Sequence, residues 1–208
     1  HRNSDGLLIL ELEPAFAQEN IPFLSFYHLA KASIKQLLET VNLKQFCEVI
    51  VKEVRKVTEF DRVMLYKFEA DGHGVVLAEE KVPELEPYLG LHYPESDIPP
   101  AARKLFASNW IRLIPDSHAE GVGLVKSADN QDNNPLDLTH SILRSASGCH
   151  LEYLHNMGVG ASLTISLIKD EKLWGLIACH HRRPKYVPYE LRKACEFLGQ
   201  VIFSEISA

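Results

Sequence analysis

The sequence contains few cysteines and no paired arrangement of them. The four stand at positions 47, 149, 179 and 195 of 208 residues, and no CxxC pair occurs. A disulfide framework is therefore not expected, and reduced thiols are typical of a cytoplasmic protein. No run approaches the ~20 apolar residues that span a bilayer. Asp5, Glu11 and Glu13 stand where a secretory leader would be basic and apolar. We expect a cytoplasmic protein without a membrane partner.

The chain also lacks an excess of positive charge and the usual metal motifs. Lys and Arg number 22 against 28 Asp and Glu, which gives a formal net charge of -6. Sequence-independent binding of nucleic acid needs a basic face, so nucleic acid is not expected as a partner. The ten histidines include no HExxH motif and no Cys/His zinc spacing. We predict no metal site. Because the sequence opens at His1, we expect an excerpt of a longer protein.

What the chain has is the composition of a folded domain, 46% hydrophobic and 24% charged. Apolar residues recur at helical spacing in some segments and alternate as in a strand in others. A Gly-rich connection at 70–74 joins two alternating runs as in a hairpin. These patterns predict an α+β fold, with a central antiparallel sheet flanked by helices and an N-terminal extended segment at 6–14. The expected helices are 23–40, 43–58, 100–108, 138–154 and 188–207, the expected strands are 61–69, 74–82, 110–114, 161–168 and 172–181, and a long loop is expected at 115–137.

Cys149 and His150 stand together in the sequence and could form a reactive pair. A thiol beside an imidazole can be activated as a thiolate, although an arbitrary Cys-His dipeptide more often packs in a core. A thiol hydrolase would need Cys, His and an orienting Asn or Asp brought together by the fold. Adjacent residues of one element point in different directions, which makes this couple an awkward nucleophile and base. We expect no enzyme here.

Five motifs, taken in order, resemble the GAF domain of phytochromes, and the resemblance extends over residues 23–207. Several motifs in the family's order and spacing are far less probable by chance than one. They are DRVMLYKF at 61–68, PESDIP at 94–99, LRS at 143–145 leading to CHLEYL at 149–154, NMGV at 156–159 and LWGLIACHH at 173–181. The opening residues are similar to the end of the PAS domain that precedes GAF in many phytochromes. The expected division is a linker at 1–22 and a bilin-binding GAF domain with flanking helices at 23–208.

The resemblance implies a photoreceptor that carries a linear tetrapyrrole (bilin). Cys149 would attach it through a thioether, and a cysteine inside GAF implies phycocyanobilin or phytochromobilin instead of biliverdin. The other implied roles are pyrrole-nitrogen partners at His150 and the Asp97 carbonyl, propionate partners at Arg112, Arg144, Ser162 and Thr164, a partner of ring D at His180, and an aromatic wall at Tyr66, Tyr93 and Tyr153.

The resemblance also implies a reversible switch between red- and far-red-absorbing states. Its output would be a histidine kinase or other domain in cis, joined through 188–207, and the terminal helices would allow a homodimer. The alternative left open is a GAF regulatory domain that binds a small ligand such as a cyclic nucleotide, with Cys149 incidental.

Overall fold

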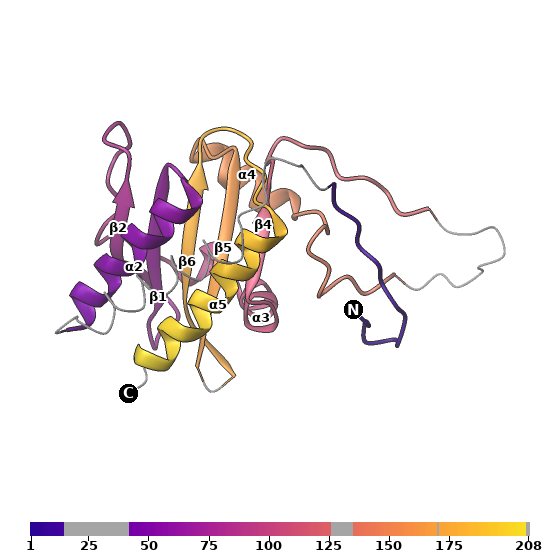
Figure 1. The fold of residues 1–208 in the computed structure, drawn as a ribbon, viewed down its shortest axis with the longest axis horizontal. Helices are drawn as coiled ribbons and strands as arrows, with labels where there is room; N and C mark the ends of the chain where they lie inside the picture. The colour runs from indigo at the N-terminus through magenta and orange to yellow at the C-terminus, as the bar shows by residue number, and fades with distance from the viewer. Residues whose placement is uncertain (15–41, 126–134, 170, 207–208) are drawn as a thin grey trace.

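A six-stranded antiparallel sheet forms the centre of the protein (Figure 1). The computed structural model describes residues 1–14, 42–125, 135–169 and 171–206. The strand order is β3-β2-β1-β6-β5-β4, and every pairing is antiparallel. With helices on both faces, this arrangement confirms the predicted α+β class. The strands are β1 (Arg62–Phe68), β2 (Gly74–Lys81), β3 (His92–Tyr93), β4 (Ile111–Ile114), β5 (Ala161–Lys169) and β6 (Lys172–His181).

Two helices, α2 (Leu43–Thr58) and α5 (Tyr189–Ile206), cover one face of the sheet and lie in front of it in Figure 1. α2 begins after Asn42, whose side chain accepts a hydrogen bond from the backbone N–H of Gln45 at 3.0 Å. Its apolar side chains recur every three or four residues and are buried against the sheet. None of the described helices has the length and apolar character needed to cross a lipid bilayer.

The alternation of side chains along the strands separates a filled face from a hollow one. In β1, Val63 and Leu65 are fully buried in the core beneath α2 and α5, whereas Met64 and Tyr66 belong to a separate cluster on the opposite face. β5 and β6 follow the same rule, because successive side chains of a strand point to opposite faces. The second face carries the 3-10 helix η1 (Glu95–Asp97), α3 (Pro100–Ser108) and α4 (Gly148–Asn156).

The predicted helix 138–154 is wrong in its first half, because α4 begins only at Gly148. Side chains hold the preceding backbone in turns instead. The Arg112 guanidinium donates to the carbonyls of Ile142 at 3.0 Å and Arg144 at 2.6 Å. The Glu11 carboxylate accepts the N–H groups of Ile142 at 3.1 Å and Leu143 at 2.7 Å. These distant partners satisfy the groups that a helix would otherwise pair.

The other predicted elements agree with the structure to within one or two residues, with three qualifications. β3 and η1 were not predicted. Residues 115–125 and 135–137, where the loop was expected, contain no helix or strand. The helix expected at 23–40 lies outside the described residues, as do residues 15–22 of the linker expected at 1–22.

The described N-terminal segment, residues 1–14, is fastened to the domain by two carboxylates. Beside the contacts of Glu11, the Glu13 carboxylate accepts hydrogen bonds from Arg192 of α5 at 2.8 Å and from the Tyr186 hydroxyl at 3.0 Å. Burial raises the pKa of Glu13, but the hydrogen bond and charge of Arg192 outweigh it, so that the pKa lies below its usual value. The segment is thus tied to both the loop before α4 and the start of α5.

The Arg192–Glu13 pair gives a first prediction. Arg192→Met should lower the free energy of unfolding by about 2 kcal/mol in urea titrations at pH 7, because it strands a half-buried carboxylate. Lys193→Met, which removes an exposed cation one residue away, should change it by no more than about 0.5 kcal/mol.

The effect of Arg192→Met should depend on pH with a definite sign. The pKa of Glu13 is lower in the folded protein than its unfolded value of 4.5. The ion pair therefore stabilises the protein fully above pH 4.5, and this stabilisation is lost as the pH falls through the pKa of the folded state. The difference in unfolding free energy between the parent protein and Arg192→Met should therefore become smaller in acid. A difference that stays constant from pH 7 to pH 3 would contradict the ion pair.

Candidate functional site

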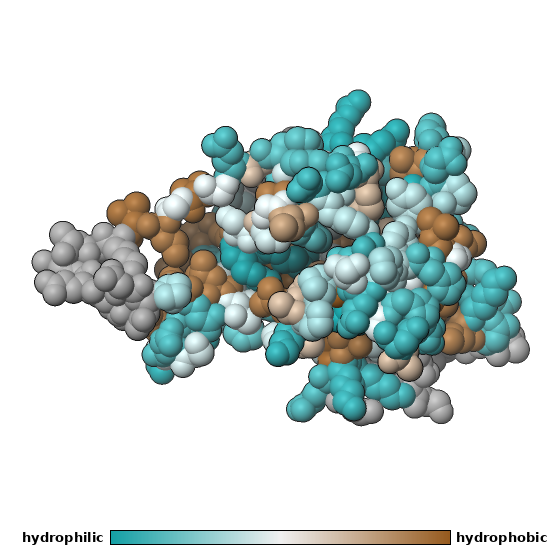
Figure 2. All heavy atoms as spheres, turned by 180° about the vertical axis from the view of Figure 1, so that it is seen from behind, coloured by the Kyte–Doolittle hydropathy of each residue, from teal (hydrophilic) through white to brown (hydrophobic). Residues whose placement is uncertain are grey.

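A cavity of about 380 Å³ lies between the sheet and the elements on its second face. Figure 2 shows the molecule from the side opposite α2 and α5, where polar side chains predominate and apolar ones show between them. The volume falls in the range of sites that bind small molecules and cofactors. The lining residues come from β1, β2, β5, β6, the 93–99 segment, α3 and α4, together with Tyr88, Ser147 and Met157.

Cys149 lies in the first turn of α4 and lines this cavity. Ser147 caps the helix and accepts the backbone N–H of His150 at 3.3 Å. Cys149 is exposed, whereas the other three cysteines are buried. Burial raises the pKa of Cys47 to about 11 and that of Cys195 to about 12, which keeps both as inert thiols. Cys149 is the thiol that a molecule in the cavity can reach.

The contacts of Cys149 bear on the thiol hydrolase that was weighed from the sequence. Within the described residues, no imidazole or carboxylate is hydrogen-bonded to its sulfur. A nucleophilic cysteine of that class needs such a base, which is itself held by a third group.

His150 follows Cys149 in α4 and also lines the cavity. Burial, and then the positive charge of Arg112, lower its pKa below the usual value, so that the neutral ring is favoured. A neutral imidazole offers one donor and one acceptor nitrogen. This ring can therefore accept a hydrogen bond from an N–H group of a bound molecule.

His180 stands on β6 between Arg62 of β1 and Ser162 of β5 in the sheet register. Burial, then the charge of Arg62 and the neighbouring His150, lower its pKa to about 3. Its Nδ1 is buried and has no hydrogen-bond partner among the described residues. A buried polar atom without a partner costs about 1–3 kcal/mol, so this nitrogen marks a place where a ligand atom would be stabilising.

Tyrosines form one wall of the cavity. The rings of Tyr66 and Tyr93 have centroids 6.0 Å apart, and Tyr66 also meets Phe68 edge-on at 5.2 Å. Burial raises the pKa of Tyr66 to about 12 and also raises those of Tyr93 and Tyr153. All three hydroxyls therefore stay protonated, which makes them both donors and acceptors inside an aromatic wall.

Tyr88 is a cavity residue that was not predicted from the sequence. The Arg62 guanidinium lies 3.5 Å from the centroid of its ring, and Glu79 accepts its backbone N–H at 2.9 Å. Arg62 and Glu79 form a buried ion pair with 3.4 Å between Nη1 and Oε1. The only available signal was Tyr88 itself in a proline-rich passage, since nothing local shows that a cation 26 residues earlier will hold it.

Nine of the eleven predicted site residues line the cavity: Tyr66, Tyr93, Asp97, Cys149, His150, Tyr153, Ser162, Thr164 and His180. Arg112 and Arg144 do not. The Arg112 side chain is engaged with the carbonyls of 142 and 144, and Arg144 donates to the carbonyl of Ser141. Burial, and then the charge of Arg144, lower the pKa of Arg112 to about 10, so Arg112 remains a cation close to His150.

Comparison with known proteins places this geometry in a family. The GAF domain family matches residues 42–208. The chromophore-binding domain of Stigmatella aurantiaca phytochrome P1 has a similar structure, with a TM-score of 0.94 and 49% identity over 100% of this chain and 68% of that one. This chain is a GAF domain of the phytochrome type.

Curated relatives of this GAF domain are phytochromes. Cyanobacterial phytochrome A of Nostoc sp. is 73% identical over the whole chain, and phytochrome-like protein Cph1 of Synechocystis sp. is 62% identical. The chain spans only 27% and 28% of the length of these two proteins. The relatives support a sensor module, and the predicted motifs and fold are those of this family.

The wall of the cavity gives a second prediction. Gly74 faces the tip of Tyr66, and a Cβ there would stand 1.8 Å from the Tyr66 hydroxyl oxygen. Gly74→Ala should therefore displace the Tyr66 ring and lower the unfolding free energy by about 1–3 kcal/mol. Gly148→Ala, where a Cβ meets nothing within 4 Å, should be neutral or stabilising because alanine favours the helix. Equal stability of the two variants in urea titrations would contradict this packing.

His180 gives a third prediction, on the pH dependence of stability. In the unfolded chain His180 takes up a proton with a pKa near 6.5, whereas burial lowers its pKa to about 3 in the folded protein. The unfolded state holds more protons in that window, so stability falls as the pH falls. The unfolding free energy of the parent protein should fall between pH 7 and pH 5, and His180→Gln should make that fall smaller by about 1–2 kcal/mol. Protonation of His180 near pH 6.5, seen by NMR of the unpigmented protein, would overturn the expectation.

Proposed function

We propose that this GAF domain carries a linear tetrapyrrole, bound covalently to Cys149 inside the cavity, and works as a light-driven switch. One observation carries the proposal: the accessible thiol, Cys149, opens on a cavity that is lined by aromatic rings and by His180, whose buried Nδ1 has no hydrogen-bond partner among the described residues. The solved structures similar to this chain include chromophore-binding domains of phytochromes. We take phycocyanobilin or phytochromobilin as the pigment.

The residues present fit such a group. Pyrrole N–H groups buried in the cavity would need acceptors, which the neutral His150 ring and the Asp97 carbonyl can supply. The unpartnered Nδ1 of His180 suits a terminal ring carbonyl as a donor. Tyr66, Tyr93 and Tyr153 supply flat apolar surface with hydroxyl groups at the edge. All of these residues line the cavity.

Propionate groups are the part of the pigment that requires a change in the protein. Ser162 and Thr164 line the cavity on β5, and Thr164 is paired with Arg112 of β4 in the sheet register. We propose that Arg112 and Arg144 pair with the propionates, since guanidinium and carboxylate form bidentate hydrogen bonds. To do so, each would exchange a carbonyl partner in the 141–144 loop for a carboxylate.

When bound, the tetrapyrrole supplies the photochemistry, which is light absorption and isomerisation of the bond before its last ring. The protein holds the other rings through Cys149, His150 and Asp97 and offers alternative partners to the last one at His180 and Tyr153. Two arrangements of these hydrogen bonds give the pocket two states, which we assign as red- and far-red-absorbing.

We further propose that the output lies outside this chain. In this view residues 1–22 link to a preceding domain, 23–208 form the sensor, and α5 transmits the change to a histidine kinase or other output domain. The terminal helices would allow a homodimer, and the protein would work in the cytoplasm. The sensor itself performs no catalysis. The alternative is a domain that binds a small ligand such as a cyclic nucleotide, in which Cys149 has no role in binding. The test below distinguishes the two functions.

The fourth prediction tests attachment and switching together. Co-expression with a phycocyanobilin pathway should give a coloured protein that shows zinc-induced fluorescence on a denaturing gel. Alternating red and far-red light should interconvert two absorption spectra. Cys149→Ala should abolish the fluorescent band.

Cys47→Ala is the matched control, because it removes a thiol that is buried in the core. That variant should keep both the fluorescent band and the spectral switch. A band that persists in Cys149→Ala would refute the attachment site, and a colourless parent protein would favour the ligand-binding alternative.

A further inference from the structure

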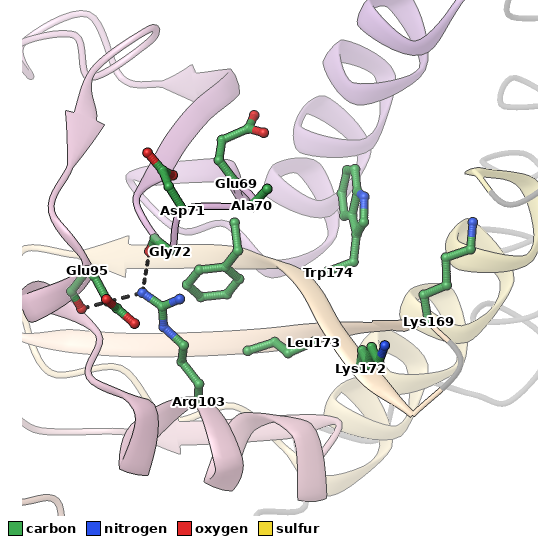
Figure 3. Close-up of a pocket in the computed structure, with 11 residues that line it drawn as sticks. Glu69, Ala70, Asp71, Gly72, Glu95, Arg103, Lys169, Lys172, Leu173 and Trp174 are labelled. Atoms are coloured by element: carbon green, nitrogen blue, oxygen red, sulfur yellow. Dashed lines mark hydrogen bonds between the residues drawn. The ribbon is translucent and has the colours of Figure 1, made fainter.

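One arginine outside the cavity joins three segments that form its wall. Arg103 lies on α3 and extends to the β1–β2 hairpin and to η1, where dashed lines in Figure 3 join it to Gly72 and Glu95. Its Nε donates to the carbonyl of Ile98 at 2.6 Å, and its Nη2 donates to the carbonyls of Gly72 at 2.5 Å and Glu95 at 3.4 Å. Arg103 itself does not line the cavity.

These contacts bracket Asp97, which does line the cavity. Two of the three carbonyls belong to Glu95 and Ile98, on either side of it. The Asp97 N–H donates to the Pro94 carbonyl at 3.1 Å and closes the turn. The neighbouring prolines have no N–H of their own, so the segment has few internal donors with which to fix its carbonyls. Arg103 supplies the missing donors from another element.

The hairpin side of the same contact leads to the tyrosine wall. Gly72 has φ +89, and a Cβ there would stand 2.8 Å from the Glu95 side chain, so the hairpin and η1 approach closely. The Arg103 guanidinium also lies 4.5 Å from the centroid of Phe68, whose ring packs edge-on against Tyr66. Arg103 thus reaches Asp97 through the backbone on either side of it, and it reaches Tyr66 through the Phe68 ring.

Only an arginine can make this set of contacts. A guanidinium offers five N–H donors in a planar fork and stacks on an aromatic face, whereas an ammonium is a point charge. No ion pair joins Arg103 to a carboxylate in the parts of the chain that the structure describes. Its charge is therefore directed at backbone carbonyls, which suits a residue that fixes the shape of a segment.

We propose that Arg103 is a positioning residue for the light switch, one that holds Asp97 and Tyr66 in a single arrangement without touching the pigment. This inference rests on the proposed function, because it assigns a role toward the bound tetrapyrrole. Without Arg103, the wall would adopt several arrangements. Pigment attachment at Cys149, on a different element, would continue.

The fifth prediction is tested first in the protein without pigment. Arg103→Gln should speed amide hydrogen exchange at Asp97 and Gly72 by about tenfold or more, because both lose a charged hydrogen bond that holds their segment. Amides in the middle of β5 should keep their rates. Lys104→Gln, which removes an exposed cation from the adjacent position of α3, should leave all of these rates unchanged. Unchanged exchange in Arg103→Gln would overturn the proposal.

The second arm uses the pigmented protein. Arg103→Gln should keep the zinc-fluorescent band, while the fraction of pigment that red light converts should fall at least about twofold. Arg103→Lys should restore only part of that fraction, because one ammonium cannot reach three carbonyls. Full restoration by lysine would show that charge alone matters and would contradict the positioning role.

The two arms separate this inference from the function on which it rests. If the parent protein takes up no pigment, the proposed function fails while the exchange rates still decide whether Arg103 holds the wall. If Arg103→Gln does not fold, Arg103→Lys carries both measurements. Normal exchange and normal conversion in Arg103→Lys would refute the proposal.

Discussion

The period-two alternation of β1, β5 and β6 is the constraint on which the rest of the structure depends. Odd-numbered side chains such as Val63, Leu163 and Ile177 are fully buried and fill the core beneath α2 and α5. The even-numbered neighbours, among them Tyr66, Ser162 and His180, face the other way and line the cavity. The larger of the two buried clusters therefore lies on one face, and the smaller one, around Met64 and Tyr66, lies on the other. On the other face a buried nitrogen of His180 has no hydrogen-bond partner among the described residues, at a cost that a ligand would remove.

The backbone around the cavity is held by side chains that come from far away in the sequence. Arg112 and Glu11 together fix the loop that leads into α4, and so they fix where Cys149 and His150 stand. Glu13 and Arg192 tie the same N-terminal segment to α5. A change at the cavity wall thus has a continuous set of contacts to the helix that we propose as the route to an output.

Local patterns predicted the parts of the fold that depend on local chemistry. The hairpin at 70–74 and the strands β5 and β6 follow from alternation, and α2 follows from an amphipathic period with Asn42 as its cap. The expected helix at 138–154 fails because Arg112 and Glu11, remote in sequence, satisfy the backbone of 142–144. For the same reason, the local sequence could not predict that Arg62 lies over the Tyr88 ring or that Arg103 binds the backbone beside Asp97. Nine site residues were found through the family resemblance, whereas the two arginines expected at the propionates are hydrogen-bonded to backbone carbonyls and do not line the cavity.

The central claim is that the pigment is tethered to Cys149 and to no other residue. Peptide mass mapping of the pigmented protein tests it most directly, because trypsin cleaves after Arg144 and Lys169 and so releases Cys149 in a peptide that holds no other cysteine. We expect the added mass of the tetrapyrrole on the 145–169 peptide alone. The same mass on a peptide carrying Cys47, Cys179 or Cys195, or on none, would contradict the account.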